Sequence, residues 1–145
     1  MEDSPDMLAR RNLPLLLLQA REHVFAHFRP ILQRAGLTDQ QWRIIRLLLE
    51  TGPLEPRQIG EHCRISSPSL AGVLTRLEQM KLIRRTRLNR DLRRVSVSLT
   101  PRSRALAGRL APRIEAVYCD IERRIGPDFC ARFYRTLDQL IRAVR

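Results

Sequence analysis

The chain has 145 residues, a length that fits one domain or one domain with a dimerisation extension. Its formal net charge is +12 at pH 7, and 26 of its 27 basic residues are arginines. The three cysteines show no CxxC spacing, which argues against a disulfide framework or a zinc ribbon, and no apolar run is long enough to span a membrane. The apolar run at 13–18 is shorter than a signal-peptide core, so we assign it to a helix of a cytoplasmic protein.

The basic charge is concentrated in the middle of the chain. Residues 56–113 hold 14 basic and 3 acidic residues, a net +11, whereas the rest of the chain sums to +1. Such a block indicates a polyanionic partner, most simply nucleic acid. Arginine suits this role because its planar guanidinium makes paired hydrogen bonds to a phosphate or a guanine edge. The codon preference of a GC-rich genome is an alternative explanation for the ratio of arginine to lysine.

The N-terminal third predicts two amphipathic helices. Residues 12–35 have apolar side chains at helical spacing, with Pro14 in the first turn and Gly36 at the C-terminal end. The next helix begins at Thr38, which can form a capping box with Gln41. The residues expected on the buried face of this helix are Trp42, Ile45, Leu48 and Leu49.

The middle of the chain predicts a helix-turn-helix followed by a hairpin. Helices are expected over 56–63 and 67–80, and strands over roughly 82–87 and 94–99. The stretch "IRRTRLNRDLRRVSV" across the hairpin holds six arginines and one aspartate. Because like charges repel and add nothing to the fold, we attribute the crowding to a binding partner; the alternative is a solvated loop.

Two long helices are expected to complete the chain. One begins at Thr100-Pro101 and is kinked at Pro112, and the last follows Gly126-Pro127 and carries a phenylalanine- and leucine-rich face. The predicted fold is therefore mainly α, a winged helix-turn-helix over 38–99 with dimerisation helices at 12–35 and 101–145, in a single domain, 1–145. The terminal helices are too apolar for so small a lobe to cover, which favours a homodimer with recognition helices about 34 Å apart.

The helix at 67–80 and the hairpin together form a candidate DNA-binding surface. Small exposed side chains let a helix enter the major groove, and the amides at its N-terminus can meet a phosphate. Arg90 at the hairpin tip suits a narrow minor groove. Arg93 and Arg94 leave the tip on opposite faces, so that one can face a phosphate while the other pairs with Asp91. The residues assigned to DNA binding are Ser66, Ser67, Ser69, Thr75, Arg76, Arg87, Arg90, Asp91, Arg93 and Arg94. For the helix alone, an ordinary solvated face is the alternative.

The segment "SPSLAGVLTRLEQMKLIRR…NRDLRRVSVSLT" resembles the recognition helix and wing of the MarR family of bacterial transcription regulators. Asp91-Leu92-Arg93-Arg94 matches the D-x-R signature of the family's wing, and "SLT" matches the exit into the next helix. "LLLQAREHVFAHFRPIL" and "GLTDQQWRIIRLLLE…GPLEPRQIGEHCRISSPSL" are similar to the branch that regulates homoprotocatechuate degradation operons. The resemblance implies a dimer that binds a palindromic DNA site and is often released by small aromatic acids. Ser103 stands where many members carry glycine, which we expect to affect only a helix start.

Asp39, Trp42 and Arg46 are spaced to lie on one face of their helix. A guanidinium beside an indole can hold an aromatic carboxylate, because it pairs with the carboxylate while the ring stacks. The alternative is that Trp42 belongs to the core and Arg46 extends past it to solvent. The family resemblance favours the ligand site and implies a pocket between the dimerisation helices and the DNA-binding lobe. Its further walls are then Arg21, Val24, Phe25, Phe28, Ile114 and Tyr118, with Asn12 from the partner chain and Tyr118 bonding a ring hydroxyl.

The sequence therefore predicts a dimeric repressor of an aromatic-compound catabolic operon, acting on double-stranded DNA at the nucleoid and released by a phenolic or aromatic carboxylate. The alternative is a redox-sensing repressor, although residues 12–35 hold no cysteine; Cys63 and Cys130 fit apolar stripes, and the place of Cys119 stays open. His23 and His27 lack an evident third metal ligand, and no cofactor is expected. No nucleophile–base set or phosphate loop indicates an enzyme, and the few aromatic residues argue against an RNA-binding module.

Overall fold

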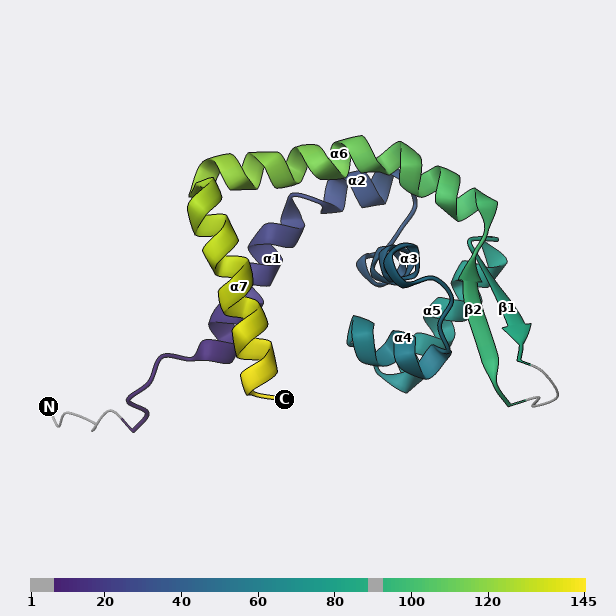
Figure 1. The fold of residues 1–145 in the computed structure, drawn as a ribbon, viewed down its shortest axis with the longest axis horizontal. Helices are drawn as coiled ribbons and strands as arrows, with labels where there is room; N and C mark the ends of the chain where they lie inside the picture. The colour runs from purple at the N-terminus through teal and green to yellow at the C-terminus, as the bar shows by residue number, and fades with distance from the viewer. Residues whose placement is uncertain (1–6, 89–92) are drawn as a thin grey trace, which may run out of the picture.

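The computed structural model describes residues 7–88 and 93–145, in which five helices are followed by one β-hairpin and two further helices. The predicted mainly α, winged helix-turn-helix fold is confirmed, with long helices at its C-terminal end (Figure 1). The elements are α1 (Leu13–Ala26), α2 (Arg29–Arg34), α3 (Asp39–Thr51), α4 (Pro56–Cys63), α5 (Ser67–Gln79), β1 (Ile83–Arg87), β2 (Val95–Leu99), α6 (Pro101–Ile125) and α7 (Pro127–Ala143).

α3 is the central helix of the lobe that also contains α4, α5 and the hairpin. Ile44, Ile45 and Leu48 of α3 are almost completely buried against residues of α4, α5 and β2. Burial of one such side chain contributes roughly 1.5–3 kcal/mol, so this face of α3 stabilises the whole lobe. The prediction that Leu49 faces inward is wrong, because Leu49 is 39% exposed. Successive helical residues are 100° apart, and Ile44 rather than Leu49 completes the buried face beside Leu48.

The capping box predicted at the start of α3 is confirmed. The Gln41 backbone N–H donates to the Thr38 hydroxyl at 3.1 Å, and the Gln41 side chain accepts from the Thr38 N–H at 3.0 Å. A similar box begins α6, where Thr100 and the fully buried Ser103 bond each other's backbone N–H groups at 3.2 and 3.0 Å. Ser103 therefore adds a hydrogen bond to this helix start that a glycine could not make.

The prediction of one continuous helix over 12–35 is wrong. The chain leaves the α-helix between α1 and α2, where the N–H groups of His27 and Phe28 bond carbonyls only three residues back. Pro30 explains the break, because it has no N–H to donate to Ala26 and its ring clashes with that carbonyl. The break separates two environments: α1 has no buried residue, whereas Phe28 and Leu32 enter the core of the lobe.

The hairpin forms as predicted, with strand boundaries within one residue of those expected. β1 pairs antiparallel with β2, from Ile83 opposite Leu99 to Arg87 opposite Val95. On its other side β2 is bridged to the segment before α4, where the N–H groups of Leu54 and Val97 each donate to the other's carbonyl, at 3.1 and 2.8 Å. The base of the hairpin is therefore fixed to the helix-turn-helix through the backbone.

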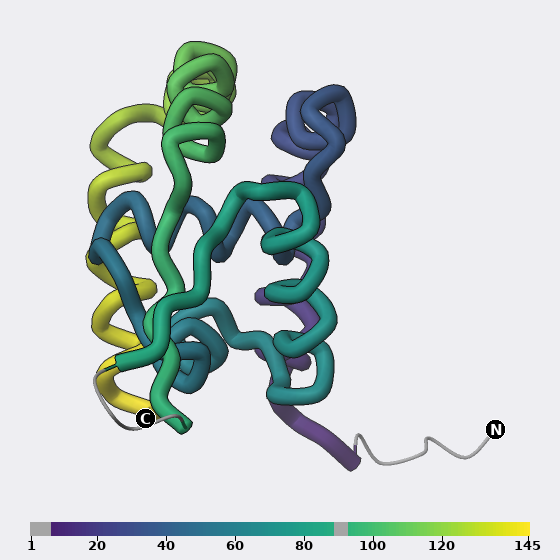
Figure 2. The backbone as a smooth tube through the Cα atoms, turned by 90° about the vertical axis from the view of Figure 1, so that its right-hand side faces the viewer, coloured from purple at the N-terminus to yellow at the C-terminus, as the bar shows by residue number. Residues whose placement is uncertain are grey.

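α6 and α7 extend away from the lobe. α6 runs without a break through Pro112 and spans about 37 Å, carrying the chain from the hairpin to α7 (Figure 1). In the perpendicular view α7 and α1 lie apart, on either side of the molecule (Figure 2). Neither helix has a buried residue, and each exposes large apolar side chains: Leu13, Leu15, Leu17, Leu18 and Val24 on α1, and Phe129, Phe133, Tyr134 and Ile141 on α7.

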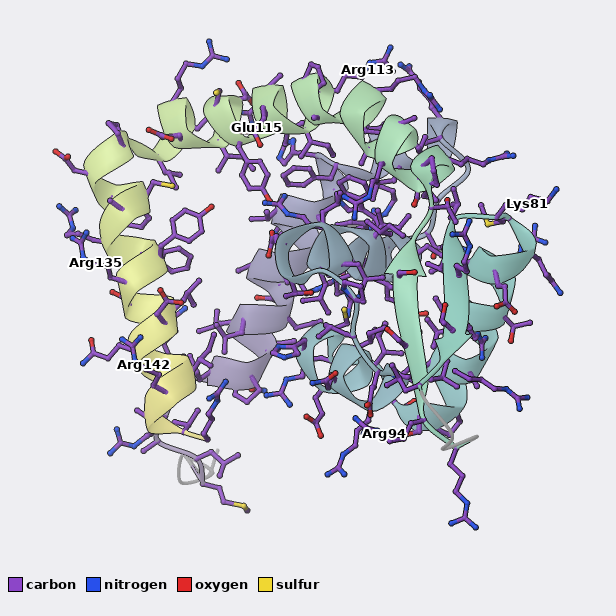
Figure 3. All side chains as sticks on the ribbon, turned by 45° about the vertical axis from the view of Figure 1, so that its right-hand side comes forward. Lys81, Arg94, Arg113, Glu115, Arg135 and Arg142 are labelled. Carbon is purple, nitrogen blue, oxygen red and sulfur yellow. The ribbon has the colours of Figure 1, made fainter. Side chains whose placement is uncertain are left out.

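α5 ends in a Schellman motif that contains a lysine in place of the usual glycine. The N–H of Leu82 bonds the carbonyl of Leu77, and the N–H of Lys81 bonds the carbonyl of Glu78, both at 2.9 Å. Lys81 consequently has φ +60, in the left-handed region, and its side chain points into solvent (Figure 3). A Cβ atom is disfavoured there, so the motif carries local strain.

Replacing Lys81 by glycine should stabilise the fold. We expect Lys81→Gly to raise the free energy of unfolding by about 0.5–1 kcal/mol, since relief of the left-handed strain exceeds the added entropy of the unfolded chain. Lys81→Ala is the matched control, because it removes the same charge but keeps the Cβ atom. Urea unfolding followed by circular dichroism at equal protein concentration compares the two, and an equal gain in both variants would assign the effect to charge.

Candidate DNA-binding surface and effector cavity

The exposed face of α5 carries the predicted DNA-binding residues of this helix. Ser67, Ser69, Thr75 and Arg76 are exposed, and Ser66 lies beside them at the N-cap, while Leu70, Leu74 and Leu77 on the opposite face are buried. The Ser66 side chain makes no cap hydrogen bond and instead donates to the hydroxyl of Ser69 at 3.1 Å. The first turn of α5 is therefore not capped by Ser66, and because Pro68 has no N–H, the amides of Ser67 and Ser69 are the ones that an anion could meet.

Gly72 lies in the middle of the same exposed face. A Cβ atom built on Gly72 meets no atom within 4 Å, among the residues that the structure describes, so packing within the chain does not require glycine here. Glycine in a helix interior costs about 1 kcal/mol relative to alanine. Because glycine has no side chain, the backbone at the centre of this face can come close to another molecular surface.

The hairpin arginines differ in their contacts. Arg85 donates to the Thr75 hydroxyl at 3.3 Å, and Arg94 donates through Nε to the Glu55 carboxylate at 2.9 Å, with a second bond from Nη2. Figure 3 shows Arg94 at the lower edge of the lobe, beside α4. Arg87 is exposed on β1. Arg90 and Asp91 lie outside the described residues, so their predicted roles stay predictions, and the partner found for Arg94 is Glu55.

A cavity of about 640 Å³ lies between α1, α3, α6 and α7. Its wall is mostly apolar, and it contains every predicted ligand-binding residue except Asn12: Arg21, Val24, Phe25, Phe28, Asp39, Trp42, Arg46, Ile114 and Tyr118. Asn12 instead caps its own helix, its side chain accepting from the N–H of Leu15 at 3.1 Å. Helical spacing indicated the α3 residues and the family resemblance implied those of α1 and α6, and the fold brings all of them to one cavity.

Arg46 is a half-buried cation on this largely apolar wall. Its Nη1 donates to the Tyr118 hydroxyl at 3.2 Å, its Nε donates to Glu50 at 3.2 Å, and its guanidinium carbon lies 5.5 Å from the centre of the Tyr118 ring. Burial opposes the charge, but the bonds and charges of Glu50 and Tyr118 outweigh that penalty, and the pKa of Arg46 is raised. Trp42 both lines the cavity and packs against the core, so the two interpretations of Trp42 are compatible.

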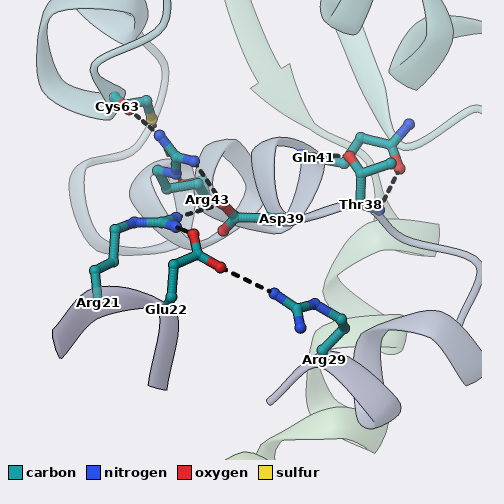
Figure 4. Close-up of polar contacts among 8 residues, drawn as sticks. All are labelled: Arg21, Glu22, Arg29, Thr38, Asp39, Gln41, Arg43 and Cys63. Carbon is teal, nitrogen blue, oxygen red and sulfur yellow. Dashed lines mark hydrogen bonds and ion pairs between the residues drawn. The ribbon is translucent and has the colours of Figure 1, made fainter. Parts of the chain in front are cut away.

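A second polar cluster lines the cavity where α1 approaches α3 (Figure 4). Asp39 accepts from Arg43 Nη2 at 2.6 Å and pairs through the same oxygen with Arg21 of α1. Arg43 Nη1 donates to the carbonyl of Cys63 at 2.6 Å, and the Cys63 thiol donates back to the Arg43 carbonyl at 3.6 Å. Arg43 therefore connects the cavity to the last residue of α4, immediately before the turn into α5.

Several cavity residues are absent from the sequence prediction. Arg43 follows Asp39 by four positions and precedes Arg46 by three, so helical spacing alone places it on the predicted face. α7 contributes Cys130, Phe133, Tyr134 and Leu137. No pattern in the sequence indicates that α7 and α3 line the same cavity, so these residues could not be predicted from the sequence.

The cysteines differ in environment. Cys63 is buried, and burial raises the pKa of its thiol although Arg43 opposes the shift, which keeps this thiol protonated and unreactive at neutral pH. Cys130 is half-buried and Cys119 is exposed. Within residues 7–88 and 93–145, no three histidine, cysteine or acidic side chains are grouped to hold a metal ion, and no helix there has the length and apolarity needed to cross a membrane.

Comparison with known proteins places this arrangement in a family. The model of the MarR family matches residues 37–95, which extend from two residues before α3 to the first residue of β2. The HTH-type transcriptional regulator FarR of Neisseria gonorrhoeae is 40% identical over 122 residues, 84% of each chain. The homoprotocatechuate degradative operon repressor of Escherichia coli is 37% identical over 130 residues, 90% of this chain and 88% of its own, which confirms the predicted likeness.

A solved structure gives the same result in three dimensions. The crystal structure of NadR in complex with 4-hydroxyphenylacetate is 38% identical to this chain, with a TM-score of 0.83 over 94% of this chain and 96% of that one. This chain is therefore similar to NadR in both sequence and fold over nearly its whole length. The chain belongs to the MarR family and is a winged helix-turn-helix transcriptional regulator, not an enzyme.

Proposed function

We propose that this protein is a dimeric repressor of an aromatic-compound catabolic operon, released from a palindromic operator by a small phenolic or aromatic carboxylate. The observation that carries the proposal is Arg46, a charged side chain held beside Trp42 and Tyr118 on an apolar cavity wall. A cation on such a wall attracts an anion that also brings apolar surface, and an aromatic carboxylate meets both conditions. A cavity of about 640 Å³ is ample for a single ring.

The relatives support this class of effector. The Escherichia coli protein is a repressor of a homoprotocatechuate degradative operon, and the NadR structure contains 4-hydroxyphenylacetate. In this chain the carboxylate would pair with Arg46 and the ring would pack on Trp42 and Phe28. Because the Tyr118 hydroxyl bonds Arg46 at 3.2 Å, it would reach a ring hydroxyl only next to the carboxylate and otherwise bond the carboxylate itself. Arg21, Asp39, Phe25 and Ile114 complete the proposed site, and Asn12 of the second chain would close it.

The exposed apolar helices support dimerisation. α1 and α7 expose leucine and phenylalanine side chains that an isolated monomer would leave in water. A second copy related by two-fold symmetry would cover them and present two α5 helices to successive turns of DNA, about 34 Å apart. The proposed DNA contacts are those assigned from the sequence, apart from Arg94. Since its target is chromosomal DNA, we place the protein in the cytoplasm, at the nucleoid.

The proposed switch is a shift between two dimer conformations. An effector would favour the conformation in which the two α5 helices are wrongly spaced for the operator; a tenfold loss of DNA affinity requires about 1.4 kcal/mol of differential binding. Arg43 offers a physical connection, because it bonds Asp39 in the cavity and the Cys63 carbonyl before α5. A thiol-based switch is the second candidate; it would rest on exposed Cys119 or half-buried Cys130, and reaction of the native protein with a thiol reagent tests it.

Removal of the Arg46 cation should weaken effector binding and with it the release of DNA. We expect Arg46→Ala to weaken binding of 4-hydroxyphenylacetate about 10- to 100-fold, because a hydrogen-bonded ion pair contributes about 1.5–3 kcal/mol. Trp42 is the sole tryptophan and lines the cavity, so its fluorescence reports occupancy. Arg135→Ala on the outer side of α7 is the control (Figure 3). Normal DNA binding with normal release in Arg46→Ala would place the effector elsewhere.

Removal of the arginine on the exposed face of α5 should weaken operator binding. Arg76→Ala is expected to reduce affinity for the DNA upstream of its own gene about tenfold or more, since one arginine contact to a base edge is worth about 1–3 kcal/mol. Gel-shift titration at fixed salt measures the change. Arg142→Ala near the end of α7 removes the same charge far from α5, and an equal loss in both variants would indicate a nonspecific charge effect (Figure 3).

A charge on the apolar face of α7 should separate the chains. Ile141 is 50% exposed and does not line the cavity, so we expect Ile141→Arg to yield monomers that bind the operator weakly. Gln139→Arg adds the same charge away from the apolar stripe and should leave the dimer intact. Sedimentation velocity distinguishes the species; a dimeric Ile141→Arg variant would show that α7 lies outside the interface.

A further inference from the structure

We propose that Arg94 is a positioning residue of the wing, the β1–β2 hairpin, and that its ion pair with Glu55 holds the wing in the orientation that DNA binding requires. The proposal rests on the DNA-binding function proposed above and reassigns one residue that the sequence places among the DNA contacts. It also gives Glu55, which no sequence pattern singled out, a role in operator recognition.

The contact itself uses two donors of one guanidinium. Nε and Nη2 of Arg94 both donate to Oε1 of Glu55, the former at 2.9 Å. Glu55 is well placed as an anchor, because it is the N-cap residue of α4 and its own N–H bonds the side chain of Gln58 at 2.9 Å. The Glu55 side chain is 32% exposed and the Arg94 side chain 60%, so the acid is the more buried partner and the arginine reaches it from the wing.

The ion pair gives β2 a second attachment to the helix-turn-helix. The first is the backbone bridge between Leu54 and Val97. Arg94 lies three residues before Val97, so the two attachments are about 10 Å apart along the strand. The bridge and the buried side chains of Val97 and Leu99 fix the base of β2, and the ion pair adds a second point of attachment at the other end of the strand. The ion pair lies one residue before the start of β2 and therefore holds that end of the strand against the N-terminus of α4.

β1 is attached in a matching way on the other side. Arg85 bonds the Thr75 hydroxyl and lies 3.6 Å from the carboxylate of Glu78, so it ties the wing to α5. By contrast, Arg84 and Arg87 are exposed and form no ion pair within the part of the chain that the structure describes. Of these four wing arginines, Arg85 and Arg94 are therefore positioning residues, and the side chains of Arg84 and Arg87 are free to meet phosphate.

The two possible roles of Arg94 predict opposite effects of removing the Glu55 charge. If Arg94 contacts phosphate, Glu55 competes with DNA for it, and Glu55→Gln should tighten binding. If Arg94 positions the wing, the same substitution loosens the wing and weakens binding, although it removes a negative charge from the protein. Exposed ion pairs add little to global stability, so the fold should tolerate either change.

The experiment measures binding of the full-length protein to the duplex upstream of its own gene by fluorescence anisotropy at several KCl concentrations. The variants are Glu55→Gln, Arg94→Gln and the double variant, with Arg87→Gln for comparison and thermal unfolding as a check on folding. We expect each of the first two to weaken binding about 3- to 10-fold and the double variant to lose no more than either alone. For these variants, the slope of log affinity against log salt concentration should equal that of the wild-type protein.

Arg87→Gln should behave differently, because loss of a phosphate contact lowers the steepness of the salt dependence by about 0.9. The positioning role would be overturned if Glu55→Gln bound more tightly or unchanged, or if Arg94→Gln lost the same steepness as Arg87→Gln. Failure of the DNA-binding proposal has a separate signature: the wild-type protein would not bind the duplex even at low salt, and the reassignment of Arg94 would fall with it.

Discussion

The two faces of α3 determine what the rest of the molecule can do. Ile44, Ile45 and Leu48 bury one face in the core of the DNA-binding lobe, and this burial fixes the rotation of the helix about its axis. The opposite face, with Trp42 and Arg46, is then turned to the cavity. One helix therefore belongs both to the lobe that carries α5 and to the wall of the proposed effector site.

The charged residues of the molecule act in two separate places. On the wing and α5 the arginines are mostly exposed, where their charges reach solvent and any polyanion. In the cavity Arg43 and Arg46 are partly buried, and each is bonded: Arg46 to Glu50 and Tyr118, and Arg43 to Asp39. A buried charge without a partner is costly, so an anionic effector would have to exchange one set of bonds for another. That exchange provides a means by which occupancy could move α3.

The terminal helices have a different physical problem. α1 and α7 expose apolar side chains and pack against little of their own chain. A second copy would remove that surface from water, and the same surface borders the cavity through Leu17 and Phe133. Dimerisation and effector binding would therefore share residues, so a ligand in the cavity would also change the dimer interface. The break at Pro30 allows this, because it lets α1 leave the lobe while α2 remains in it.

The sequence by itself determined the features that depend on near neighbours along the chain. The capping boxes, the buried face of α5, the strands of the wing and the grouping of Asp39, Trp42 and Arg46 follow from spacing within one helix or hairpin. The break at Pro30 belongs to the same class and was predictable from proline chemistry. The wrong placement of Leu49 shows how far helical spacing can be trusted. A shift of one residue along a helix rotates the side chain by 100° about the axis.

Only the tertiary structure decided which distant residues meet. Arg43 bonds the Cys63 carbonyl across 20 positions, and Arg94 bonds Glu55 across 39. The side chains of α7 reach the cavity for the same reason, through a sharp turn at Gly126 that no periodicity in the sequence records (Figure 1). Composition identified the wing as basic, but the use of each guanidinium depends on whether folding brings a carboxylate or a hydroxyl within bonding distance. Hydrogen bonds act over about 3 Å, and local sequence patterns do not specify contacts across the fold at that scale.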